Sequence, residues 1–220
     1  MITPALHART ILCLGAHSDD IEIGCGGTLL HLLSATPAPR VHWVVFSADE
    51  RRAAEARAAA QRIVGSAHAE VVIEAFPDGR FPGRIDALKT RFEALKGEFA
   101  PELIFTHYRD DRHQDHRVIS ELTWNTFRDH LILEYEIPKY DGDIGRPNLH
   151  VPLSEDAVSR KIEVLMDCFA SQHDHRWFDA ATFGGLMRLR GVECNAASGY
   201  AEAFHAHKIV VTGSNDNERP

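Results

Sequence analysis

Short apolar segments alternate with helical patterns over the first 130 residues of this 220-residue chain. We expect buried strands at 10–16, 41–46, 69–76 and 101–107, with helices at 28–33, 52–64, 84–96 and 116–130. Such an alternation is typical of βαβ units, in which a parallel sheet carries helices on both faces. The pattern therefore predicts an α/β fold with a doubly wound, mostly parallel sheet.

The second half of the chain is less regular. It predicts a strand at 131–137, an ordered loop at 139–148, a helix at 155–169 and a last strand at 208–212. We found no repeat or linker that would divide the chain, so we expect one domain over 1–220 with a frayed polar tail at 211–220. The polar and aromatic stretch 135–148 is expected to form a wall or lid of a substrate cleft.

Composition limits the classes of partner. The formal net charge is -8 and no basic block occurs, so we expect no nucleic-acid partner. No apolar run of 18 residues occurs, so we expect no integral membrane segment. The four cysteines form no CxxC pair, which favours free thiols in a reducing cytoplasm. The oligomeric state stays open, a homo-oligomer included.

Two polar clusters each follow an expected strand. The segment AHSDDIEIGCGGT spans 16–28 and follows the first strand, and HYRDDRHQDH spans 107–116 and follows the fourth. Ligands of open α/β sheets bind beyond the carboxyl ends of the strands, at a switch point of strand order. If the first and fourth strands are neighbours, the two clusters face each other.

The side chains of these clusters are imidazoles and carboxylates, which are good ligands for Zn²⁺ and similar ions. A catalytic zinc takes three protein ligands, and we expect His17, Asp20 and His116 to supply them, with Fe²⁺ as an alternative metal. Asp19 is then held beside the metal and is the expected general base for a metal-activated water.

The second cluster also supplies an acid. We expect His113 to stabilise an oxyanion and donate a proton to a leaving group, with Asp115 as its orienting carboxylate. The glycines 24, 26 and 27 are expected to allow tight turns near the site, since GCGGT is not a GxGxxG signature. Glu22 is expected at the surface or stabilising a loop.

The sequence resembles the LmbE/PIG-L family of zinc-dependent N-deacetylases. The family opens with a segment like AHPDDxExGCGGT and continues with HxDH, and this chain has AHSDDIEIGCGGT and HQDH. RAAEARAAAQRIVG at 52–65 and YAEAF at 200–204 are also similar to the family, so the resemblance covers nearly the whole chain. Ser18 departs from a proline that is frequent there, which changes the stiffness of the turn and not its ligands.

The resemblance implies a Rossmann-like three-layer sandwich and hydrolysis of an N-acetyl or other N-acyl group on an amino-sugar or glycoconjugate substrate. It implies the same three zinc ligands and the same roles for Asp19, His113 and Asp115. Arg52 and Asp78 match positions that contact the sugar in relatives. Two alternatives stay open: a metal-binding regulatory protein without turnover, and a hydrolase of another amide or ester.

Overall fold

The computed structural model describes residues 5–65 and 69–210. Within these ranges, seven strands form one sheet in the order β3-β2-β1-β4-β5-β7-β6. They are β1 (Thr10–Gly15), β2 (Arg40–Val45), β3 (Ala69–Ile73), β4 (Leu103–His107), β5 (Leu131–Tyr135), β6 (Leu149–Pro152) and β7 (Ala201–His205). The strands β1 to β5 run parallel, whereas β7 is antiparallel to both of its neighbours.

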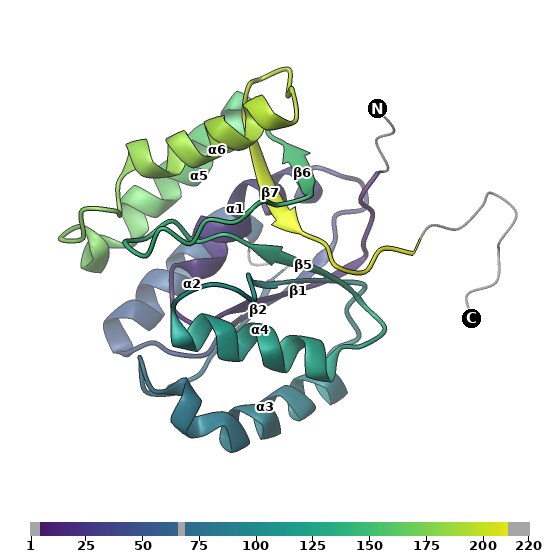
Figure 1. Cartoon of the computed structure of the whole chain (residues 1–220), viewed down its shortest axis with the longest axis vertical. Coiled ribbons are helices and arrows are strands. Elements are labelled where there is room, and N and C mark those ends of the chain that lie inside the picture. The colour runs from purple at the N-terminus through teal and green to yellow at the C-terminus, as the bar shows by residue number, and fades with distance from the viewer. Residues whose placement is uncertain (1–4, 66–68, 211–220) are drawn as a thin grey trace, which may run out of the picture.

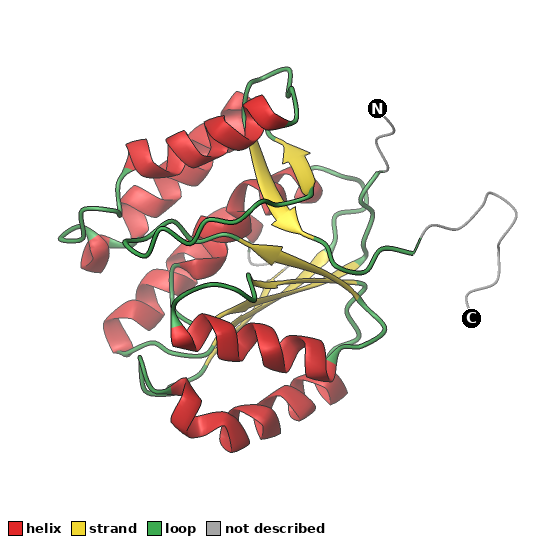
Figure 2. Cartoon of the chain, in the orientation of Figure 1, coloured by secondary structure: helices red, strands yellow, loops and turns green. Residues whose placement is uncertain are grey.

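The helices cover both faces of the sheet, as Figures 1 and 2 show. They are α1 (Asp20–Leu33), α2 (Glu50–Val64), α3 (Ile85–Glu98), α4 (Gln114–Thr126), α5 (Glu155–Cys168) and α6 (Ala180–Glu193). The first two pack with α5 and α6 on one face, and α3 packs with α4 on the other. The predicted α/β sandwich with a mostly parallel sheet is therefore confirmed.

The core lies in two layers because the central strands are buried on both faces. Along β1, Ile11 and Cys13 pack on the side of α1, α2 and α5. Leu12 and Leu14 pack on the side of α3 and α4. A strand that is covered on both faces needs apolar residues at every position, which explains its continuous apolar run.

The helix starts carry polar caps. The side chains of Asp49, Ser154 and Asp179 each accept a hydrogen bond from the backbone N–H three residues further on, at the starts of α2, α5 and α6. Such caps satisfy backbone donors that have no partner within the helix. Gly65 ends α2 with a φ of 76°, a conformation that favours glycine.

The last third of the chain differs from the prediction. Both β6 and β7 were missed, as was α6, and the strand expected at 208–212 is wrong for residues 208–210, while 211 and 212 lie outside the described residues. The segment 201–205 was missed because Glu202 and His205 are polar, although every residue of β7 is buried. In α6, Gly184 and Gly185 lower the helix propensity of the segment.

One sheet joins all seven strands of the described ranges. The prediction of a single domain over 1–220 stays a prediction, and its tail at 211–220 lies outside the described residues. Within residues 5–65 and 69–210, no helix has the length and apolar character needed to cross a membrane.

Candidate active site

The two polar clusters meet because β1 and β4 are neighbours in the sheet. Three buried side chains converge there: Nδ1 of His17 lies 3.2 Å from Nε2 of His116, which lies 3.4 Å from Oδ1 of Asp20. The distance from Nδ1 of His17 to Oδ2 of Asp20 is 3.5 Å. The structure thus brings together the three side chains that the sequence predicts as ligands.

The donor set fits a divalent cation. Nδ1 of His116 lies 3.0 Å from Oδ2 of Asp111, so a hydrogen bond to this carboxylate leaves Nε2 to face His17 and Asp20. Metal-binding histidines are usually held in this way by a carboxylate on the second nitrogen. Within the described chain, three groups of ligand atoms could hold an ion: His17, His113 and His116; Asp20, His107 and His116; and His17, Asp78 and Asp115. The predicted triad of His17, Asp20 and His116 is not one of these groups, but it shares two members with each of the first two.

Burial and charge oppose each other at Asp20. Burial alone would raise its pKa, but the imidazoles of His116 and His107 lower it well below its ordinary value. The charged carboxylate is therefore favoured at the bottom of the site. The pKa of His116 is lowered to about 4, first by burial and then by His107, so this imidazole is neutral and available as a ligand near neutral pH.

His107 is a site residue that the sequence prediction missed. It is the last residue of β4 and is fully buried beneath His116, with the two rings stacked at 3.9 Å between centroids. Its Nε2 accepts a hydrogen bond from the backbone N–H of Ala16 and lies 3.2 Å from Oδ2 of Asp20. Its place as the first residue of HYRDDRHQDH was the available signal, but an imidazole that ends an apolar strand also fits a core position.

Asp19 lies beside the converging ligands with Arg52. The guanidinium of Arg52 donates from Nη2 to Oδ1 of Asp19 at 3.1 Å and from Nε to Oγ of Ser18 at 2.9 Å. Burial raises the pKa of Asp19, and the charge of Asp20 adds to this, while Arg52 lowers it. Arg52 therefore contacts Asp19, the predicted general base, directly. Its contact with a substrate stays a prediction.

Asp78 reaches the same cluster from the loop after β3. Its Oδ1 lies 3.0 Å from Nε2 of His17, and its side chain is 61% exposed. The hydrogen bond from His17 lowers the pKa of Asp78 to about 2, against the smaller effect of partial burial. Asp78 thus joins the buried site to solvent, and its contact with a substrate stays a prediction.

His113 and Asp115 contact each other in a different way from the prediction. His113 is the N-cap of α4, and its Nδ1 accepts a hydrogen bond from the backbone N–H of Asp115. The carboxylate of Asp115 accepts instead from the backbone N–H groups of Gly79 and Phe81 and lies 3.3 Å from Nε2 of His17. The expected carboxylate–imidazole pair is not formed, because the start of α4 turns this carboxylate towards the loop at 79–81.

The position of His113 still suits a proton donor. Its ring lies 4.9 Å from that of His17 and 4.5 Å from that of His116, measured between centroids. Since Nδ1 accepts a hydrogen bond, the proton of the neutral ring is on Nε2. Burial, followed by the charge of His17, lowers the pKa of His113.

The glycines and Glu22 lie inside α1 and not in a turn, which corrects both expectations. A Cβ on Gly24 would overlap the ring of Tyr135, and a Cβ on Gly27 would lie 2.6 Å from Leu153 and 3.0 Å from Glu202. These glycines therefore permit close packing of α1. Glu22 is fully buried, not at the surface, and burial raises its pKa well above the ordinary value.

The chain matches known proteins over the region that holds this site. Residues 12–127 match the PIG-L family, described as GlcNAc-PI de-N-acetylase, and this range is more than half of the chain. Three solved structures, each below 20% identity, share the fold.

The first is the N,N'-diacetylchitobiose deacetylase of Pyrococcus horikoshii, with 18% identity, a TM-score of 0.65, and coverage of 90% of this chain and 84% of that one. The second is GalB, the 4-carboxy-2-hydroxymuconate hydratase of Pseudomonas putida KT2440, with 19% identity, a TM-score of 0.70, and coverage of 94% and 99%. The third is the A40926 pseudoaglycone deacetylase Dbv21, with 18% identity, a TM-score of 0.69, and coverage of 93% and 99%. The match over residues 12–127 includes both polar clusters, most of β1 and all of β2 to β4, and the chain belongs to the PIG-L (LmbE-like) family of deacetylases.

Proposed function

We propose that this protein is a metal-dependent hydrolase that removes an N-acetyl group from an amino-sugar substrate. The observation that carries the proposal is the convergence of His17, Asp20 and His116, with Asp19 on one side and His113 on another. Membership of a deacetylase family and the deacetylases among the structures of this fold support the reaction class.

Each side chain has a role that its contacts support. His17, Asp20 and His116 would hold the metal, for which Zn²⁺ is the first choice and Fe²⁺ the second. A divalent ion bound there would polarise the amide carbonyl and lower the pKa of a bound water to roughly 7. Asp19, fixed by Arg52, would accept the proton of the attacking water.

His113 would serve the leaving group. Its Nε2 is the ring nitrogen not engaged by the backbone of α4, so Nε2–H would donate a hydrogen bond to the developing oxyanion. The proton that Asp19 takes from the water would pass to the departing amine, by way of His113 if its ring is protonated in turn. Asp115 would hold the ring of His17 in place, because one carboxylate oxygen lies near Nε2 of His17 and also accepts a hydrogen bond from the backbone N–H of Gly79. Arg52 and Asp78, whose charged groups lie 3.9 Å apart and whose side chains are 19% and 61% exposed, would meet the hydroxyl groups of a sugar.

The test is acetate release from a panel of N-acetylglucosamine compounds, with bound metal measured on every sample. Asp19→Asn should keep its metal and lose about 10²–10⁴-fold in turnover, since general base catalysis contributes that much. Asp110→Asn, which changes an exposed carboxylate in the neighbouring loop, is the matched control and should turn over like wild type.

The outcomes separate the alternatives. If wild type binds a metal but releases acetate from none of the compounds, the substrate class is wrong, and other amides, esters and the 4-carboxy-2-hydroxymuconate of the hydratase are tried next. If metal-loaded wild type turns over none of them, a binding or regulatory role replaces the enzyme. If Asp19→Asn remains fully active with its metal bound, Asp19 is not the base.

A further inference from the structure

A buried ion cluster lies behind the metal ligand His116. Nζ of Lys139 is 3.0 Å from Oδ2 of Asp111 and 2.5 Å from Oδ2 of Asp143. The exposed fractions of the three side chains are 9%, 3% and 5% in that order, so water screens their charges little. We call these three residues the latch cluster.

The latch cluster joins two loops. Asp111 belongs to the loop between β4 and α4, and Lys139 and Asp143 belong to the segment 136–148 that follows β5. Oδ2 of Asp143 also accepts a hydrogen bond from the backbone N–H of Arg112 at 2.6 Å. The segment expected from the sequence to be a wall or lid of the cleft is therefore bound to the loop that positions the second ligand cluster.

The carboxylate of Asp111 contacts Lys139 within the latch cluster and also two residues of the candidate active site. Its Oδ2 lies 3.0 Å from Nδ1 of His116, and its Oδ1 accepts a hydrogen bond from the backbone N–H of His113 at 2.7 Å. A single oxygen, Oδ2, thus lies between the ammonium of Lys139 and the imidazole of His116. Any movement of Lys139 changes the partner that orients a proposed metal ligand.

We infer that Lys139 is a positioning residue for the metal site, acting on His116 through Asp111. Without its ammonium, the carboxylates of Asp111 and Asp143 would be left buried side by side with no cation between them, and they would repel each other. The carboxylate of Asp111 would then move away from the imidazole of His116. Loss of a partner that orients a metal ligand typically costs about 10–100-fold in metal affinity. This inference rests on the proposed metal centre.

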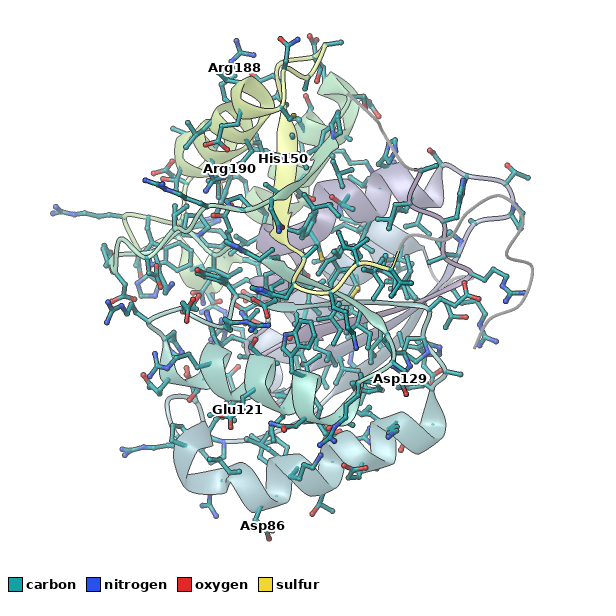
Figure 3. All side chains as sticks on the ribbon, turned by 45° about the vertical axis from the view of Figure 1, so that its right-hand side comes forward. Asp86, Glu121, Asp129, His150, Arg188 and Arg190 are labelled. Atoms are coloured by element: carbon teal, nitrogen blue, oxygen red, sulfur yellow. The ribbon has the colours of Figure 1, made fainter. Side chains whose placement is uncertain are left out.

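A second buried ion pair in the same segment provides a control. Glu136 accepts hydrogen bonds from Nε and Nη2 of Arg190 at 2.9 and 2.6 Å, and Nη2 of Arg190 also donates to the carbonyl of Gly145. Arg190 lies on α6, where Figure 3 labels it, and these hydrogen bonds involve none of the three residues of the latch cluster. Loss of this pair loosens the segment and leaves the contact between Asp111 and His116 in place.

The experiment measures the Zn²⁺ dissociation constant of the full chain by competition with a chromophoric chelator, together with the thermal midpoint of the metal-free protein. Lys139→Met should weaken Zn²⁺ binding at least tenfold, and Lys139→Arg should recover most of the loss. Lys139→Gln, a milder change, serves if the methionine variant does not fold and should weaken binding by a smaller factor. Glu136→Gln should lower the thermal midpoint and leave Zn²⁺ binding within about twofold of wild type.

The results decide between positioning and simple attachment of the loop. Weakened Zn²⁺ binding confined to the variants without a cation at 139 supports the inference. Unchanged or tighter Zn²⁺ binding in Lys139→Met and Lys139→Gln overturns it, as does an equal loss in Glu136→Gln. If wild type itself binds no Zn²⁺, Fe²⁺ or Co²⁺, the proposed metal centre fails and the inference with it.

Discussion

The ring of His107 lies under the ring of His116, with planes inclined by 18°, and Nε2 of His107 is 3.2 Å from Oδ2 of Asp20. One buried imidazole therefore touches two proposed metal ligands. We predict that His107→Phe, which retains a stacking ring and removes the nitrogen atoms, weakens Zn²⁺ binding by about 10–100-fold. Chelator competition measures the loss, and His205→Gln, a change at another buried histidine, should bind Zn²⁺ like wild type.

One result would contradict the prediction for His107. Undiminished Zn²⁺ affinity in a folded His107→Phe variant would mean that the ring acts only by packing. Near-UV circular dichroism of the metal-free protein checks that the variant is folded before the affinities are compared.

The close contact between α1 and β5 leads to a second prediction. A Cβ on Gly24 would overlap the ring of Tyr135, whereas a Cβ on Gly26 would meet Ile63 at 3.4 Å, an ordinary packing distance. We expect Gly24→Ala to lower the free energy of unfolding by about 1–3 kcal/mol through overpacking. Gly26→Ala should raise it by up to about 1 kcal/mol, because alanine favours a helix. Urea unfolding distinguishes the two, and equal effects at the two positions would contradict the packing explanation.

A third prediction concerns the buried ion pair between Lys161 and Glu202. Nζ of Lys161 lies 2.6 Å from Oε1 of Glu202, which also accepts from the backbone N–H of Gly27, while Oε2 accepts from that of Thr28. Lys161→Met leaves this carboxylate buried without its cation, so we expect a loss of about 3–5 kcal/mol in the free energy of unfolding.

An exposed pair provides the comparison for Lys161. Arg62 and Asp167 form an ion pair at 2.8 Å with side chains 40% and 63% exposed. Arg62→Met should change the free energy of unfolding by less than about 1 kcal/mol. The explanation fails if the two methionine variants unfold at the same urea concentration.

His205 gives a prediction about pH. It stacks on Tyr108 with ring centroids 3.9 Å apart, and burial lowers its pKa to about 4, against the charge of Glu134 and together with that of His207. The unfolded chain protonates this residue below about pH 6.5, whereas the folded chain resists protonation until about pH 4, so His205 reduces stability as the pH falls through that range. His205→Gln should therefore lose less unfolding free energy than wild type between pH 7 and pH 5. Parallel urea titrations at the two pH values check this, and equal losses would rule His205 out as the source.

The first two thirds of the fold could be predicted because apolar pattern and structure agree there. Strands such as β1 and β4 are buried on both faces, so they are continuous apolar runs in the sequence. The end of the chain does not follow this rule. In β7, Glu202 is buried because it meets Lys161 and two backbone donors of α1, and such partners cannot be identified from a local pattern.

The candidate site could likewise be predicted from the sequence only in part. Its residues close in sequence, such as His17 and Asp20, or His113 and His116, could be grouped from motif spacing, and the pairing of β1 with β4 brings the two groups together. The contacts that orient them are less accessible to sequence reasoning. That Asp111 serves His116, and that Asp115 serves His17, depends on how the start of α4 turns its side chains.

The contact of Glu202 with the middle of α1 also bears on the order in which the protein is made. Residues 27 and 202 are 175 positions apart, so two backbone donors near the centre of the first helix have their carboxylate partner only after nearly all of the chain has been synthesised. A nascent chain of about 160 residues would hold both polar clusters but neither Lys161 nor Glu202. Because contacts between distant parts of a chain are the slow ones to form, we expect the helix that begins with Asp20 to reach its final packing late, after translation has passed β7.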